Sequence, residues 1–193
     1  MSGTASAPHF FDEAPPPADV AEPVDVRPPP WTGPPDNVLG RAVDLAAVLA
    51  RTPTLAIVAD AFRAYPTGVR FTLTVAFRLR ERAYPDPFNS RLLLGVGMAD
   101  GRRARSHLGD ATAGEPVLWQ LGGHGGSRRA EMDFWLHPLP PPGPMLVVVK
   151  WEDAGVDEHA VEVDAAPLVA AAAEAEELWP DDRPVEGWGW RAR

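Results

Sequence analysis

The chain contains no cysteine and only one lysine, Lys150, among its 193 residues. The absence of cysteine excludes disulfide bonds, thiolate metal sites, iron–sulfur clusters and cysteine nucleophiles together. The other 17 of its 18 basic side chains are arginine. Any positively charged surface on this protein is therefore built almost entirely from arginine.

Long apolar runs are also missing. The longest, near residues 165–173, falls well short of the roughly 18 residues that a membrane helix needs. Residues 1–11 have neither the basic cluster nor the apolar segment of a secretory signal. We therefore expect no membrane contact and a cytoplasmic location. The formal net charge of −9 disfavours nucleic acid as a partner.

Proline is concentrated at the start of the chain. Residues 1–35 hold 10 of the 23 prolines, including two runs of three. Proline fixes its own φ angle and has no N–H to donate, so the sequence predicts a disordered or extended leader over residues 1–35. Phe10, Phe11 and Trp31 are the aromatic residues within it. Either these side chains are solvated with the leader, or they dock on the domain or on a partner.

A period of two dominates the chain from residue 43 onward. Val69, Phe71, Leu73 and the next alternate positions are apolar as far as residue 79, and Arg70, Thr72 and their successors separate them. This alternation indicates a half-buried strand, and Tyr65-Pro66-Thr67-Gly68 before it is typical of a tight turn. The sequence predicts a hairpin of strands 54–64 and 69–80.

Further strands follow at intervals of roughly ten residues. An Asp100-Gly101 turn joins two of them, and a proline-rich connector over residues 138–144 precedes an apolar strand. Residues 43–49 fit either a strand or a helical face, and we favour the strand. The remaining predicted strands are 92–98, 102–108, 117–121, 131–137, 145–151 and 159–163. Over residues 43–180 this pattern predicts an antiparallel β-sandwich, Ig-like or jelly-roll-like.

One helix is expected, near residues 165–179. Asp164 can cap it and Pro167 falls in its first turn. Leu168, Ala172 and Trp179 lie at helical spacing, so the pattern predicts one buried stripe. The Trp179-Pro180 pair ends the predicted helix and leaves a tail over residues 181–193.

Three parts of the chain resemble a group of uncharacterised actinobacterial proteins. They are the segment DFWLHPLPPPGP at 133–144 with VVKW at 148–151, the segment RAYPTGVRFT at 63–72, and the turn at 99–101. The resemblance covers about residues 43–180. It implies one folded unit, and it implies no chemistry because the group has no assigned activity.

A glycine-rich segment, residues 122–127, contains His124 and is followed by two arginines. We interpret it as a flexible hairpin connection. The alternative is an anion site, since glycine lets backbone N–H groups approach a phosphate, although a strand-like segment follows where a phosphate loop needs a helix. His107, His124, His137 and His159 lack the spacing of a familiar metal site, so we expect neither a metal nor another cofactor.

Charge is distributed unevenly along the chain. Residues 63–105 carry nine arginines and three acids, whereas residues 151–182 carry eleven acids and no basic residue. Arg70, Arg78 and Arg80 are predicted to point outward from one sheet face. Such a face either pairs with acids of the same chain or binds a second copy or an acidic partner.

Two tryptophans of the tail, Trp188 and Trp190, are the remaining candidate binding residues, since tryptophan is favoured at binding hot spots. No arrangement typical of a catalytic site is present, so the sequence favours a non-catalytic interaction or assembly module. The partner would be another protein or a second copy. A small-ligand or carbohydrate binder with Trp119, Trp135 and Trp151 as stacking surfaces is the alternative. An unrecognised enzyme is the third hypothesis.

Overall fold

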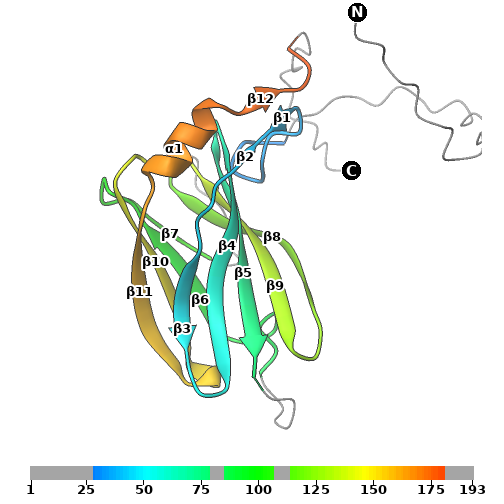
Figure 1. The fold of residues 1–193 in the computed structure, drawn as a ribbon, viewed down its shortest axis with the longest axis vertical. Helices are drawn as coiled ribbons and strands as arrows, with labels where there is room; N and C mark the ends of the chain where they lie inside the picture. Colours follow the sequence, from blue (N-terminus) through cyan, green and yellow to red (C-terminus); the bar gives the residue numbers. More distant parts are fainter. Residues whose placement is uncertain (1–27, 79–84, 107–113, 181–193) are drawn as a thin grey trace, which may run out of the picture. The chain divides into compact units, whose positions relative to one another are not determined.

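Strands make up most of the computed structural model, which describes residues 28–78, 85–106 and 114–180 (Figure 1). They form three antiparallel sheets of six, four and two strands, and one α-helix accompanies them. The predicted mainly-β sandwich is therefore confirmed. Residues 1–27, Arg80, His107, Trp188 and Trp190 lie outside the described residues.

The six-stranded sheet has the order β2-β4-β5-β9-β8, and β3 pairs with β4 beyond the end of β2. Its strands are β2 (Arg41–Ala42), β3 (Ala47–Arg51), β4 (Leu55–Tyr65), β5 (Gly68–Phe77), β8 (Val117–Gly125) and β9 (Arg129–His137). The predicted hairpin is present as β4 and β5, joined by the two-residue turn at Pro66-Thr67. The strand predicted near residues 43–49 is confirmed from Ala47 onward.

The four-stranded sheet has the order β11-β10-β6-β7. Its strands are β6 (Leu92–Gly97), β7 (Arg103–Arg105), β10 (Pro144–Trp151) and β11 (Val156–Asp164), and a 3-10 turn η1 (Glu152–Ala154) links the last two. The Asp100-Gly101 turn joins β6 to β7, with Gly101 at φ 86°. The third sheet pairs β1 (Val38–Leu39) with β12 (Glu176–Glu177).

The core lies between the inner faces of the two larger sheets. Val69, Phe71 and Leu73 of β5 are fully buried and share one hydrophobic cluster with Val147, Val149 and Trp151 of β10. Phe71 stacks between Phe62 and Phe134, with ring centroids 5.1 and 5.9 Å away. Trp151 is completely buried and donates its indole N–H to Ser90 Oγ at 2.8 Å, so its polar atom is satisfied inside the core.

The helix α1 (Ala166–Ala173) is shorter than the sequence predicts. Leu168 and Ala172 are buried as expected, but Trp179 is 61% exposed and lies beyond the helix. After Ala173 the chain turns and pairs with β1, and the backbone N–H of Leu178 donates to the carbonyl of Asn37 at 2.8 Å. The predicted stripe of buried residues is therefore confirmed for Leu168 and Ala172 and is wrong for Trp179, because the helix ends at Ala173. This helix is too short to cross a membrane, and no other described helix could do so.

Candidate interaction surface

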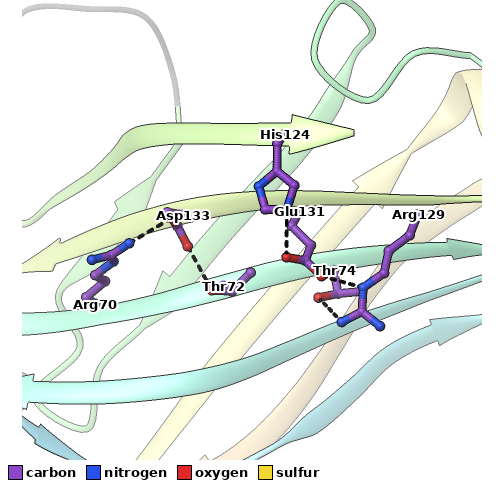
Figure 2. A network of polar contacts seen from close by, with 7 residues as sticks. All are labelled: Arg70, Thr72, Thr74, His124, Arg129, Glu131 and Asp133. Carbon is purple, nitrogen blue, oxygen red and sulfur yellow. Dashed lines mark hydrogen bonds and ion pairs between the residues drawn. The ribbon is translucent and has the colours of Figure 1, made fainter. Parts of the chain in front are cut away.

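The outer face of the six-stranded sheet holds two of the predicted binding residues, Arg70 and His124 (Figure 2). Arg70 lies on β5 and donates to Asp133 Oδ2 at 2.8 Å, and the Thr72 hydroxyl donates to the other oxygen of Asp133, also at 2.8 Å. His124 lies on β8 and contacts Glu131 at 3.2 Å. The structure thus brings both residues onto one face, linked through the carboxylates of β9.

Arg129 completes this network by forming an ion pair with Glu131, and it also contacts the Thr74 hydroxyl at 3.5 Å (Figure 2). Both arginines drawn in the figure lie next to a carboxylate of the same chain. Arg78, the third described candidate, is exposed and donates to the carbonyl of Pro53 at 3.4 Å. Of the two outcomes that the sequence left open for Arg70, the structure therefore favours pairing with an acid of the same chain.

Burial and hydrogen bonding act in opposite directions on the carboxylates of this sheet face. Burial alone would raise the pKa of Asp133, but the hydrogen bonds from Thr72 and Arg70 outweigh it and hold that pKa below its usual value. Across β5, the pKa of Asp60 is raised because burial and nearby Glu131 outweigh the attraction of Arg129. The two carboxylates are shifted in opposite directions by their surroundings.

Acidification should weaken the contribution of Asp133 to stability. A carboxylate with a depressed pKa in the folded state stabilises the fold above the unfolded pKa of about 4, and this contribution disappears as the pH falls through the folded value. We expect Asp133→Asn to be less stable than wild type at pH 7 and to approach wild type at pH 3. Urea unfolding at the two pH values measures this difference. A stability gap that is equally large at both would contradict the assignment.

Only Gly126 and Ser127 of the glycine-rich segment lie in the predicted hairpin connection. Residues 122–125 belong to β8, and the turn to β9 comes only after them. The ring of Phe88 lies over Gly123 and Gly125, and a Cβ at Gly123 would come within 2.6 Å of it. A cavity of about 520 Å³ opens beside this ring and reaches His124 and Ser127. Its lining of phenylalanine, proline and Asp86 differs from the helix N-terminus of a phosphate loop.

Two of the three tryptophans proposed as stacking surfaces are unsuited to that role. Trp135 and Trp151 are completely buried, whereas Trp119 of β8 is 38% exposed. Among the described residues no three histidine or carboxylate side chains come together as a metal site. Of the three tryptophans proposed as stacking surfaces, only Trp119 therefore has an accessible ring.

The outer face of the four-stranded sheet is different in kind. Its central strands present Leu93 and Leu146, which are 51% and 42% exposed, and Gly95 and Gly97, which carry no side chain. Lys150 of β10 also points outward beside Leu93 and forms an ion pair with Glu152. Exposed Arg103 lies on the edge strand β7, and exposed Glu158 and Glu162 lie on the opposite edge strand β11. Among the described residues neither Arg103 nor Glu162 forms an ion pair. We call this outer surface of β11, β10, β6 and β7 the amphiphilic face.

Residue pairing aligns the amphiphilic face into straight rows across the strands. In one row Glu162 lies beside Leu146, Leu146 beside Gly97, and Gly97 beside Arg103. The row thus reads acid, leucine, glycine, arginine from one edge of the sheet to the other. The uneven charge of the sequence was the signal for this surface, but the sequence reasoning placed the arginines of interest on the other sheet and missed Arg103.

Comparison with known proteins gives no assignment for this fold or this surface: no family model, no curated protein and no solved structure matches the chain.

Proposed function

We propose that this chain is a non-catalytic assembly module and that a second copy of the chain docks on the amphiphilic face. The observation that supports the proposal is the exposure of Leu93 and Leu146 on a sheet face that lies between an arginine edge and an acidic edge. Leu93 and Leu146 lie at opposite ends of the paired strands, with Val148, Gly95 and Gly97 between them. Two exposed leucines that share one regular sheet face favour a docking surface, since scattered single apolar residues need no such explanation.

The dimensions of the face set the strength of the contact. Strands of nine, eight, six and three residues, with a rise of about 3.4 Å per residue and a spacing of about 4.8 Å, cover about 400 Å². Two such faces in contact would bury about 800 Å² in total, which is below the size of a standard specific interface and is typical of a weak, transient contact. The proposed assembly is therefore reversible and depends on protein concentration.

A glutamate at Leu146 should abolish this assembly. Leu146→Glu buries an unpaired carboxylate at the centre of the contact, where desolvation is costly. Sedimentation velocity over a range of about 5–500 μM should show a dimer of the wild type that the variant does not form. Val48→Glu is the matched control, because Val48 is 47% exposed and lies on the outer surface of the other large sheet.

Two outcomes would contradict the proposal. One is a wild type that stays monomeric over the whole concentration range. The other is a dimer that Val48→Glu disrupts as strongly as Leu146→Glu, because the contact would then not be specific to the amphiphilic face.

A further inference from the structure

The order of residues across the amphiphilic face specifies how two copies can meet. We infer that they pair face to face about a two-fold axis that runs parallel to the strands between β10 and β6. In this arrangement Glu162 of each copy lies opposite Arg103 of the second copy, and Leu146 lies opposite Gly97. The inference rests on the proposed function and adds the symmetry, the register and the residues that select them.

The symmetry argument begins with the row that joins Glu162, Leu146, Gly97 and Arg103. Rotation by a half turn about an axis along the strands reverses left and right in the facing copy. In the facing copy the order across the sheet becomes Arg103, Gly97, Leu146, Glu162. Each acid of this row therefore lies opposite an arginine, and each leucine lies opposite a glycine. Because the contact is isologous, two ion pairs form per dimer and the assembly closes at two copies.

The other in-plane two-fold axis runs across the strands and gives the opposite result. It would place β11 over β11 of the second copy and β7 over its own equivalent. Glu158 and Glu162 would then face the same acidic strand, and Arg103 would face the same arginine strand. Like charges brought together in an interface oppose association. The charges therefore select the axis parallel to the strands.

The shape of the face favours the same arrangement. At two of the three outward pairs β10 carries the larger residue, with Leu146 beside Gly97 and Val148 beside Gly95. At the third pair Lys150 lies beside Leu93, and the half turn places each of these opposite the other in the second copy. A Cβ at Gly97 would lie 3.6 Å from the Cβ atom of Leu146, and a Cβ at Gly95 would lie 3.8 Å from that of Val148. The half turn places the raised strand β10 of one copy over the lower strand β6 of the other. Leucine and valine side chains can then fill the space above the glycines.

Charge reversal tests this register. Arg103→Glu places two acids opposite each other, and Glu162→Arg places two arginines opposite each other. Each single variant should weaken dimer formation at least about tenfold at low salt, because attraction becomes repulsion in both pairs. The double variant Arg103→Glu/Glu162→Arg should recover association close to that of the wild type.

A mixture gives a second readout that a damaged fold would not give. One copy with Arg103→Glu carries two acids at the paired positions, and one copy with Glu162→Arg carries two arginines. An equimolar mixture should therefore form the mixed dimer although neither variant associates alone. Arg51→Glu, a charge reversal at an exposed residue of β3, is the control and should leave the wild-type association unchanged.

The outcomes separate the inference from the proposed function. If Leu146→Glu abolishes the dimer but neither the double variant nor the mixture restores association, the register is wrong and the amphiphilic face remains the docking surface. If the wild type does not associate at all, both are overturned. Recovery in the double variant and in the mixture would support the axis parallel to the strands.

Discussion

Replacing Trp135 with alanine is expected to lower the free energy of unfolding by about 3–5 kcal/mol, the usual cost of removing a large buried aromatic side chain. Trp135 is completely buried although it lies on the outer face of β9. Its ring packs edge-on against Tyr65 with centroids 5.6 Å apart, and its indole N–H donates to the carbonyl of Pro30 at 2.9 Å. The substitution would remove this packing and the attachment of the segment around Pro30 at once.

Two further variants separate the packing from the hydrogen bond. Trp135→Phe keeps an aromatic ring but has no donor for Pro30, so we expect a loss of about 1–2 kcal/mol. Trp119→Ala is the matched control, because Trp119 pairs with Trp135 across the strands but is 38% exposed. Chemical denaturation followed by circular dichroism measures all three. Equal losses for Trp135→Ala and Trp119→Ala would contradict the description of a covered outer face.

Trp135 also shows where sequence reasoning reaches its limit. Alternation along residues 131–137 predicts the inward positions of β9 correctly, because Met132, Phe134 and Leu136 are all buried. It correctly places Trp135 on the outer side of the strand, but it does not predict which residues pack over the side chain. One of these residues is Pro30, which is 105 positions away in the chain. Local periodicity reports on which side of a strand a residue lies and says nothing about what packs there.

The same distinction explains the helix. Alanine-rich composition and the spacing of apolar residues favour continuation to Trp179. The chain leaves the helix after Ala173 because residues 176–178 pair with the strand that contains Val38. These contacts join positions about 140 residues apart, so no window of local sequence contains both partners. By contrast, the β4–β5 hairpin and the Asp100-Gly101 turn depend on neighbours in sequence and were predicted.

The amphiphilic face could be predicted only in part, because its charges are visible in the sequence but their alignment is not. The blocks of arginine and acid are visible in the sequence, and they do supply the two edges of the amphiphilic face. The alignment of Glu162, Leu146, Gly97 and Arg103 depends on the register of three strand pairs. A shift of one residue in any pair would turn one strand's residues to the other side of the sheet. Composition shows which charges are present, and only the register shows which of them share a row.

The glycine-rich strand β8 leads to the second large effect, because Gly123→Ala should lower the free energy of unfolding by about 1–3 kcal/mol. A Cβ at this position would lie 2.5 Å from the backbone oxygen of Glu131 and 2.6 Å from a ring carbon of Phe88. Phe88 is partly exposed and has room to move, but the Glu131 oxygen belongs to the paired strand β9. Relief of the contact therefore requires the two strands to separate locally.

Gly122 is the matched control, since it is the preceding residue of the same strand and a Cβ there would meet nothing within 4 Å. Gly122→Ala should leave stability unchanged or raise it by up to about 1 kcal/mol, because alanine restricts the unfolded chain more than glycine does. Adding Phe88→Ala to Gly123→Ala should not restore stability, because the contact with the Glu131 oxygen remains. Denaturation curves that coincide for Gly122→Ala and Gly123→Ala would show that this segment is the flexible connection predicted from the sequence and not a closely packed strand.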